Sequence, residues 1–539
     1  MTAAVSRLIA PRREMLIAGA LACVGAALLV VLAPPTGDAP AHLYRTLLVR
    51  EGVYVWDNLW YGGHYPLASY SLLYYLPAAL VGNLPLVFAA VVVSAALFAS
   101  IVEREWGAAG IWPARAFAVL AAGPIFVGTY SYALGLAAGL GALRALQGGH
   151  RWLAVGAAAL TLGFSPLAFV FLCIVLLALV LVRRVGPHTL AFGAALAGIA
   201  AVQLGALVFF PSSGPYPFRA LELAAVLTVS VLGAELARRA RHGALLGAFF
   251  LVWGAGSILL FAVSTPVGEN LTRLRSVVFP LMLMTAFLAR FRPRWLAALA
   301  LSAALVYNVA PYAGAALDRT DVRASHRAFW APAVSFLAER SSPNYRVEVV
   351  PTFDHWEAYW LPRAGIPLAR GWYRQIDIAR NEFFYDKPLP ASVYRAWLRG
   401  MGVRFVVLPN TRLGQKGEER EAAILRSGRS GLRQVFVSPQ LRIFELPRPE
   451  PILTGPGAPV VTRLDHAGIE GRLPAAGSYR LKIRYTRYWR VKAGAVCVEH
   501  AQGGMTVLRA TKPGRFDLAV PEGPAALVRS LVERDPARC

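Results

Sequence analysis

The run MLIAGALACVGAALLVVLAP (15–34) carries no charged residue, and the stretch TGDAPAHLYR (36–45) that follows it carries Asp38, His42 and Arg45. A helix needs about 20 apolar residues to cross the roughly 30 Å hydrocarbon core of a bilayer. The run therefore predicts a membrane span. The polar stretch after it predicts the start of a loop outside the membrane.

Comparable apolar runs recur along the first 315 residues and predict about eleven spans. The runs lie near 15–34, 84–103, 113–129, 132–148, 152–164, 166–182, 188–210, 218–237, 243–263, 274–290 and 295–315. Residues 66–82 are also apolar, but their tyrosines and two prolines suit an interfacial or re-entrant helix better. The fold class is therefore a polytopic α-helical membrane protein.

Composition supports a membrane protein and argues against a protein that binds nucleic acid. Of 539 residues, 56% are hydrophobic, and the mean hydropathy is +0.49, whereas soluble domains hold about 45–50% apolar residues. The formal net charge of +25 is large. Its arginines lie mainly between the apolar runs, where they set the orientation of the spans. We therefore expect no nucleic acid as a partner.

The basic residues also predict the topology. Cytoplasmic loops of membrane proteins are enriched in Lys and Arg, and alternate loops of this chain hold the arginines. These are Arg104 and Arg115, Arg144 and Arg151, Arg183 and Arg184, Arg238, Arg239 and Arg241, and Arg290, Arg292 and Arg294. We expect a multi-pass protein of the cell membrane with a cytoplasmic N-terminus. The loop 35–83 and the C-terminal region would then be extracytoplasmic.

The pattern predicts a membrane domain over residues 1–318 and two further domains. Residues 319–448 mix helix signals near 326–339 and 391–401 with strand signals at 346–350, 403–409 and 432–438, which indicates an α/β domain. Residues 449–539 hold short alternating strands, such as 479–489, and read as a β-rich, sandwich-like domain. If this region is outside the cell, Cys497 and Cys539 could form a disulfide.

Asp38 allows two interpretations. A helix that starts after it would make Asp38 an N-cap, with Pro40 tolerated in the first turn. Asp38 and His42 also lie at i and i+4, on one side of such a helix. There the carboxylate could take a proton from a hydroxyl nucleophile, and a nearby arginine would keep it ionised. Asp38 and His42 are thus candidate catalytic residues, and Arg45 is a candidate for binding substrate or phosphate.

The aromatic stretch WDNLWYGGHYP (56–66) also allows two interpretations. Its tryptophans and tyrosines are typical of the belt at a membrane interface. Aromatic rings beside Asp57 and His64 would equally suit a sugar, which stacks its apolar face on a ring while polar groups bind its hydroxyls.

The outer loop STPVGENLTRLR (264–275) carries charge that topology does not require. Glu269, Asn270, Arg273 and Arg275 are its candidate residues. One interpretation is that arginines extend from the membrane interface towards water. The other is a phosphate clamp, because guanidinium matches phosphate oxygens bidentately. Two residues apart on a helix, Arg273 and Arg275 diverge, so only one easily faces a shared cavity.

Several motifs are absent from the sequence. It holds no Walker loop, no dinucleotide-binding fingerprint on a strand–helix unit, no HExxH and no CxxC pair. No set of residues shows recognisable metal-ligand spacing. We therefore expect no metal site and no cofactor, although a divalent metal is not excluded.

GDAPAHLYR (37–45), followed by WYGGHYPLASYSLLYYLP (60–77), resembles the GT-C class of membrane glycosyltransferases, whose hallmark is an acidic residue just after the first span. The closer resemblance is to bacterial membrane proteins labelled 6-pyruvoyl-tetrahydropterin synthase-related, of actinobacterial type. GENLTRL (268–274), LARGWYRQID (368–377) and VRFVVLP (403–409) are similar to that group. The sequence departs from a strict Asp-Asp or Asp-Glu pair because Ala39 follows Asp38.

The resemblance implies a GT-C-like bundle and a glycosyltransferase that inverts the sugar carbon. The donor would be a polyprenyl-phosphate-linked sugar, and the acceptor a cell-envelope glycan, lipid or protein. Asp38 would be the general base, Arg273 would hold the leaving lipid phosphate, and Asp57 would be the second acidic residue.

Two other functions remain open. A transporter or flippase of lipid-linked envelope intermediates would need polar residues at mid-bilayer and broken helices, and this sequence has few such residues. A non-catalytic membrane scaffold could instead bind envelope glycans through its β-rich tail. Replacing Asp38 by Asn separates these readings, because only an enzyme would lose activity while it still folds.

Overall fold

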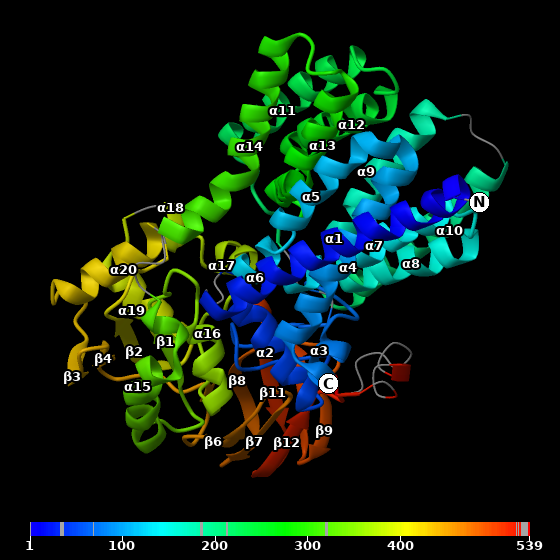
Figure 1. Cartoon of the computed structure of the whole chain (residues 1–539). Coiled ribbons are helices and arrows are strands. Elements are labelled where there is room, and N and C mark those ends of the chain that lie inside the picture. The colour runs from blue at the N-terminus through cyan, green and yellow to red at the C-terminus, as the bar shows by residue number, and fades with distance from the viewer. Residues whose placement is uncertain are drawn as a thin grey trace. The chain divides into compact units, whose positions relative to one another are not determined.

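The computed structural model describes residues 2–32, 37–67, 69–183, 187–211, 214–317, 322–386, 388–414, 416–523, 525, 528–529 and 537–539. The chain forms two compact units, and neither is continuous in sequence. Unit 1 consists of Met1–Ala39, Tyr70–Leu207 and Ser213–Thr320. Unit 2 consists of Pro40–Ser69, Val208–Ser212 and Asp321–Cys539. Each unit is described by itself below (Figure 1).

Unit 1 is a bundle of helices. Its elements are α1 (Thr2–Leu32), α3 (Tyr75–Val81), α4 (Asn83–Trp106), η1 (Gly107–Gly110), α5 (Ile111–Leu120), α6 (Gly123–Val127), α7 (Tyr130–Gln147), α8 (Arg151–Phe164), α9 (Pro166–Val182), α10 (Pro187–Phe209), α11 (Ala220–Arg238), α12 (Ala244–Ala262), η2 (Gly268–Leu274), α13 (Arg275–Leu288) and α14 (Arg294–Leu317). The sequence shows why helices begin where they do. For α9, the Ser165 side chain accepts a hydrogen bond from the Ala168 amide, and Pro166 occupies the first turn.

The expected count of about eleven spans is not confirmed. Among the described residues, seven helical segments are long and apolar enough to cross a membrane. The stretch 83–127, where two runs had predicted two spans, counts as one of these seven segments, although it consists of α4, η1, α5 and α6. Helices α8 and α9 hold only 14 and 17 residues, and α3, within the stretch 66–82, holds seven. Apolar runs are thus more numerous than the described helical segments that are long enough to cross a membrane, because α8 and α9 are apolar but shorter.

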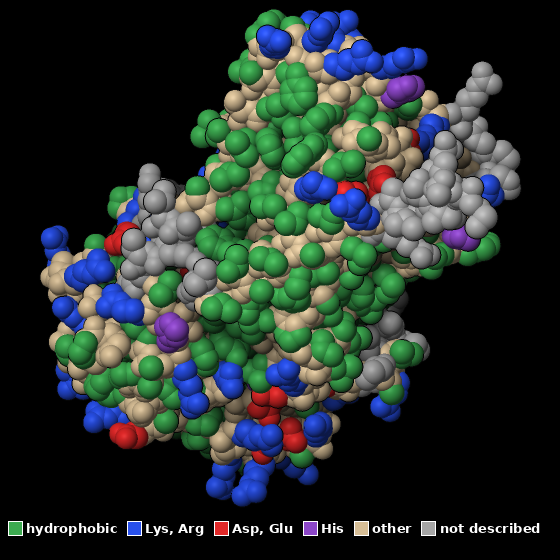
Figure 2. All heavy atoms as spheres, in the orientation of Figure 1, with side chains coloured by type: hydrophobic (Ala, Val, Ile, Leu, Met, Phe, Trp, Pro, Cys, Tyr) green, Lys and Arg blue, Asp and Glu red, His purple; other side chains and the backbone are tan. Residues whose placement is uncertain are grey.

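The surface of unit 1 has the distribution expected of a membrane protein. Figure 2 shows apolar side chains along the flank of the helices and Lys or Arg side chains at the end where α11 gives way to α12 and α13 to α14. The exposed arginines of these two turns are Arg238, Arg239, Arg241, Arg290, Arg292 and Arg294. Unit 1 is thus a polytopic helical membrane domain.

Unit 2 begins in α2 (Ala39–Arg50), of which only the first residue belongs to unit 1, and continues with an α/β part. Its helices are α15 (Arg327–Arg340), α16 (Glu357–Trp360), α17 (Arg374–Asn381), α18 (Phe383–Asp386), α19 (Ala391–Gly400) and α20 (Lys416–Arg426), and its strands are β1 (Arg346–Val349), β2 (Val403–Pro409), β3 (Arg433–Val437) and β4 (Leu441–Glu445). The sheet order is β1-β2-β4-β3, with β1 and β2 parallel and the other pairs antiparallel. Helices α16 to α19 form the crossover that a parallel pair requires.

The three strands and two helices expected in this α/β part are confirmed, and β4 was missed. Strand β4 has the short sequence LRIFE, and only Ser438-Pro439 separates it from β3 as a turn signal. Its buried positions are Leu441, Ile443 and Phe444, which do not alternate strictly. A five-residue strand of this kind is difficult to distinguish from a loop.

The rest of unit 2 consists of two four-stranded antiparallel sheets. The strands are β5 (Leu453–Thr454), β6 (Val460–Leu464), β7 (Gly468–Leu473), β8 (Gly477–Arg484), β9 (Arg490–Ala493), β10 (Val496–His500), β11 (Met505–Ala510) and β12 (Gly514–Ala519). Their orders are β10-β11-β8-β5 and β6-β7-β12-β9. The β-rich tail is confirmed, although the strand expected over 479–489 ends at Arg484. Cys497 and Cys539 form a disulfide with Cα atoms 5.0 Å apart.

The fold is therefore a polytopic helical membrane protein with a C-terminal α/β part and a β-rich part. Both C-terminal parts belong to unit 2, which also includes residues 40–69. The boundaries 1–318, 319–448 and 449–539 remain predictions.

Candidate functional site

Asp38 lies in a turn of unit 1 just before α2. Its amide donates a hydrogen bond of 3.3 Å to the carbonyl of Val127, the last residue of α6. Gly37 precedes it with φ 61°, and a Cβ at this position would lie 2.7 Å from the same carbonyl oxygen. Only glycine allows so close an approach with this backbone. The turn therefore holds Asp38 firmly against the end of α6.

Arg273 of η2 is the partner of the Asp38 carboxylate. Its Nη1 donates a hydrogen bond of 2.7 Å to Asp38 Oδ2, across 235 positions in the sequence. The Asp38 side chain is 10% exposed and the Arg273 side chain 32%. A charge-assisted bond of this length in a partly buried site is among the stronger hydrogen bonds of proteins. The two residues expected to act as base and phosphate holder are thus brought together.

The N-cap interpretation of Asp38 receives no support from the described contacts. The side-chain bond that the structure shows goes to Arg273, not to an amide of α2. One carboxylate oxygen therefore has a cationic partner, and the acceptor capacity of the other is available to a ligand.

Arg275 diverges from Arg273, as their spacing predicts. Its Nη2 donates to Thr272 Oγ1 at 2.7 Å and pairs with Glu222 at 3.3 Å, and its guanidinium lies 4.9 Å from the ring centre of Tyr307. These contacts occupy Arg275 with neighbouring parts of unit 1. Whether it also binds phosphate remains a prediction.

Glu269 pairs with Arg219, the residue before α11. The two side chains form bonds of 2.8 and 2.6 Å, and the Arg219 amide adds a third at 3.0 Å. The Arg219–Glu222 ion pair is also present, at 3.3 Å. Glu269 thereby attaches η2 to α11. The backbone of Asn270 donates to Val267 at 2.9 Å, and its role in binding remains a prediction.

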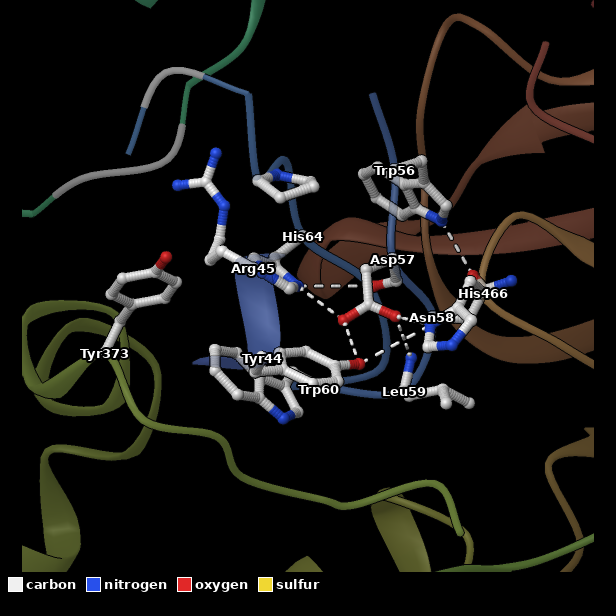
Figure 3. Close-up of polar contacts among 12 residues, drawn as sticks. Tyr44, Arg45, Trp56, Asp57, Asn58, Leu59, Trp60, His64, Tyr373 and His466 are labelled. Atoms are coloured by element: carbon white, nitrogen blue, oxygen red, sulfur yellow. Dashed lines mark hydrogen bonds and ion pairs between the residues drawn. The ribbon is translucent and has the colours of Figure 1, made fainter. Parts of the chain in front are cut away.

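Asp57 occupies the centre of a second cluster, in unit 2 (Figure 3). The Asp57 side chain is fully buried, and it accepts hydrogen bonds from Tyr44 Oη at 2.9 Å and from the Leu59 amide at 3.0 Å. His466 Nδ1 lies 2.9 Å from Asp57 Oδ1, and His64 Nδ1 lies 3.6 Å from Asp57 Oδ2. Protein groups thus surround both carboxylate oxygens.

Burial and neighbouring charged groups shift the pKa values of Asp57 and His466 in opposite directions. Burial raises the pKa of Asp57, but the hydrogen bond and charge of His466 outweigh it and hold the pKa below its usual value. Burial lowers the pKa of His466, and Asp57 with Glu51 more than reverses this. Burial lowers the pKa of His64 to about 4, so His64 is neutral at pH 7. Asp57 and His466 therefore favour each other's charged forms, beside a neutral imidazole.

Aromatic rings enclose the Asp57 cluster. The Tyr44 and Trp60 rings stack with centroids 4.3 Å apart, and Trp60 and His64 stack at 5.4 Å. Trp60 is fully buried, so its faces are occupied by protein rather than offered to a sugar. We expect this cluster to hold the fold of unit 2. The role of Asp57 as a second catalytic acid remains a prediction.

Arg45 and His42, both on α2, are also buried in unit 2. Arg45 Nη1 donates to Ser69 Oγ at 2.7 Å, and that hydroxyl lies 2.9 Å from Tyr373 Oη. His42 accepts a bond from Thr46 Oγ1 through its carbonyl oxygen. Asp38 falls in unit 1 and His42 in unit 2, so the i, i+4 spacing does not place them in one compact unit.

Sequence reasoning missed His466, Tyr44 and Tyr373. His466 lies in the turn between β6 and β7, 409 positions from Asp57. No spacing rule connects residues so far apart. Among the described residues, no group of three or more His, Cys, Asp or Glu side chains could hold a metal ion.

Unit 1 contains an apolar cavity of about 220 Å³. Side chains of α4, α7, α9, α12 and α13 line it, among them Phe98, Leu140, Leu172 and Val277. Leu274, the residue after Arg273, is also part of the lining.

Comparison with known proteins gives limited similarity. No protein-family model and no curated protein matches the sequence. The cryo-EM structure of arabinofuranosyltransferase AftD from Mycobacteria is similar with a TM-score of 0.49 and 17% identity, over 84% of this chain and 41% of that one. One class of an AftD mutant gives a TM-score of 0.48 and 15% identity, over 96% of this chain and 60% of that one. This chain thus spans less than two thirds of the length of AftD, and similarity at this level assigns no activity.

Proposed function

We propose that this protein is a membrane glycosyltransferase of the GT-C type. The observation that carries the proposal is the Asp38–Arg273 pair, a carboxylate and a guanidinium joined at 2.7 Å in unit 1. A sugar transfer from a lipid phosphate needs these two groups, a base for the acceptor and a cation for the leaving phosphate. The resemblance of residues 37–45 to the GT-C class points to the same residue, Asp38.

The reaction would be a single displacement. An acceptor hydroxyl loses its proton to Asp38, and its oxygen forms a bond to the anomeric carbon while the bond from that carbon to the phosphate oxygen breaks. The lipid phosphate leaves with the electron pair, and Arg273 stabilises its charge. Attack from the face opposite the leaving group inverts the anomeric carbon. The phosphate of the donor would compete with Asp38 for Arg273, which frees the carboxylate to accept the proton.

The cavity in unit 1 supports a lipid-linked donor. Its lining is almost wholly apolar, and it includes Leu274 beside Arg273. A polyprenyl chain in this cavity would have its phosphate close to Arg273. The donor we propose is therefore a polyprenyl-phosphate sugar.

The reaction would occur on the extracytoplasmic side of the cell membrane, with a glycan, lipid or protein of the cell envelope as acceptor. Two observations support this side. The arginines of the turns α11–α12 and α13–α14 gather at one end of unit 1, as cytoplasmic loops do. The Cys497–Cys539 disulfide is typical of an oxidising compartment.

The apolar cavity would also suit a transporter or flippase of a lipid-linked intermediate, so the experiment must separate transfer from transport. Wild-type protein, Asp38→Asn and Glu222→Gln are purified in nanodiscs and incubated with a panel of polyprenyl-phosphate sugars and an envelope extract. Glu222→Gln is the matched control, because Glu222 also pairs with arginine in unit 1. Mass spectrometry follows donor loss and glycosylated product.

We expect wild type and Glu222→Gln to consume the same donor, and Asp38→Asn to be slower by about 10²- to 10⁴-fold, the usual contribution of a general base. Circular dichroism and thermal unfolding verify that Asp38→Asn is folded. If wild type consumes no donor but moves it across the bilayer of a proteoliposome, the protein is a transporter. If it binds glycans and does neither, it is a scaffold.

A further inference from the structure

Arg346 is a fully buried arginine with almost no polar partner. It begins β1 in unit 2 and is 0% exposed. Its Nη1 donates to the carbonyl of Met401 at 2.8 Å, whereas its Nε and Nη2 have no hydrogen-bond partner. Buried polar groups in proteins are nearly always paired. Two unpaired guanidinium nitrogens therefore indicate a missing ligand.

The turn at Gly62 and Gly63 brings two further arginines to Arg346. The Arg484 amide donates to the carbonyl of Gly62 at 2.7 Å, and Arg380 Nη1 donates to that of Gly63 at 3.2 Å. Gly62 has φ 68°, and a Cβ on it would lie 3.4 Å from Arg346 Nη2. A glycine at this position keeps the space in front of Arg346 open. The three residues and the turn all belong to unit 2.

The three guanidinium groups lack the acidic partners that such groups usually have. Within the part of the chain that the structure describes, none of Arg346, Arg380 and Arg484 forms an ion pair. Arg370, a comparably buried arginine of the same unit, pairs with both Glu348 and Glu421. Burying an unpaired charge is costly, so the charges of the three arginines are much less well compensated than the charge of Arg370.

The charges also act on one another. Burial lowers the pKa of Arg346 to about 9, and the charge of Arg484 contributes. Burial and the same Arg484 charge lower the pKa of Arg380 to about 9, against the weaker opposing effects of Tyr61 and Asp377. All three groups still carry their charge at pH 7. Arg380 and Arg484 are only partly buried, so an anion can reach the cluster from solvent.

We propose that Arg346, Arg380, Arg484 and the Gly62–Gly63 turn bind a phosphate group. Guanidinium donors match phosphate oxygens in geometry. A phosphate monoester carries about −1.5 to −2 charges at pH 7 and three acceptor oxygens, which suits three cations better than a carboxylate with one charge. The phosphate is either a free ion or an ester on an envelope molecule. This site is separate in its residues from the transfer reaction proposed above.

The experiment measures binding to the full-length protein in nanodiscs of zwitterionic lipid. Equilibrium dialysis uses inorganic phosphate in one arm and glycerol 3-phosphate, a soluble phosphomonoester, in the other, with chloride keeping the ionic strength constant. The variants are Arg346→Met and, because a core substitution can impair folding, the partly exposed Arg484→Met. Arg480→Met is the matched control, since Arg480 lies on the same strand β8 and is exposed.

We expect wild type to show one saturable site, and both variants to bind about tenfold or more weakly, the effect of one lost hydrogen bond to a charged group. Arg480→Met should bind like wild type. Tighter binding of glycerol 3-phosphate identifies an esterified phosphate, and tighter binding of the inorganic ion identifies free phosphate. The proposal is overturned if neither ligand saturates wild type, or if all three variants bind like it. The readout is binding, so it stands or falls independently of glycosyl transfer.

Discussion

Each unit of this protein holds a largely buried carboxylate beside a cation, and the two differ in how completely protein donors surround the carboxylate. In the described residues, the Asp38 side chain accepts a hydrogen bond from Arg273 alone. Asp57 is contacted by Tyr44, by His466 and by a backbone amide. A carboxylate with unused acceptor capacity can take a proton from a ligand, whereas a saturated one stabilises the fold. We therefore expect the chemistry in unit 1 and a structural role for the Asp57 cluster.

We expect the largest effect on the reaction from replacing Arg273, the cation of the Asp38–Arg273 pair. Arg273→Gln removes the charge proposed to stabilise the leaving phosphate, and we expect a loss of about 10²- to 10³-fold in kcat, as for other groups that stabilise transition-state charge. Turnover of the polyprenyl-phosphate donor measures it. Arg219→Gln serves as the control, because Arg219 is exposed and pairs with Glu269 and Glu222. Equal losses in both variants would mean that the Asp38–Arg273 pair is structural too.

The next effect concerns pH and His64. Its folded-state pKa of about 4 lies below the ordinary 6.5, so unfolding takes up a proton between these values. The stability that neutral His64 contributes is fully present above about pH 6.5 and is lost as the pH falls towards 4. The loss amounts to about 3 kcal/mol.

Thermal unfolding of wild type and His64→Gln from pH 4 to 8 tests this prediction. The difference in stability between the two proteins should shrink as the pH falls and stay constant above pH 6.5. A difference that does not change with pH would show that His64 is hydrated and not buried in a dry cluster.

A smaller effect is expected for Asp57→Asn. The variant keeps the shape of the side chain but removes the charge that His466 faces at 2.9 Å. We expect a loss of about 1.5–3 kcal/mol in the free energy of unfolding, the value of a hydrogen bond to a charged group. The rate per folded molecule should stay close to that of wild type. A large loss of rate with unchanged stability would instead make Asp57 the second catalytic acid.

The smallest effect is expected at the rim of the same cluster. Glu51 is 46% exposed and lies 3.1 Å from His466 Nε2. Exposed ion pairs contribute about 0.2–1 kcal/mol, so Glu51→Gln should barely change the midpoint of thermal unfolding. If Glu51→Gln destabilises the protein as much as Asp57→Asn, the charge of His466 depends on Glu51 and the buried pair is not dominant.

The sequence predicted elements whose pattern is local. Strands β1 and β2 were found because RVEVV and VRFVVLP are short, valine-rich runs bounded by turns. Strand β4 was missed because LRIFE is short and closely follows β3. The expected number of full crossings is not confirmed, because hydropathy alone does not distinguish a short helix inside the bundle from a span.

The candidate site could be predicted in its residues but not in its contacts. Asp38 and Arg273 stood out because each is a charge where topology requires none, yet nothing in the sequence indicates that they touch across 235 positions. His466 gave no signal, since a histidine in a β-turn is ordinary. The sequence does not single out Arg346 either, and only its complete burial makes it notable.

Unit 2 is assembled from segments that the ribosome makes at very different times. Residues 40–69 emerge first, and their partners follow only after residues 70–320, with Glu522 closing the set by binding the amides of Tyr54, Val55 and Trp56. At about 5–20 residues per second, the interval is roughly 10–50 s. During this time residues 40–69 lack the segments of unit 2 that they pack against. Their apolar side chains would need a chaperone or the membrane surface to cover them. Separate expression of residues 321–539 would leave the same core unfilled.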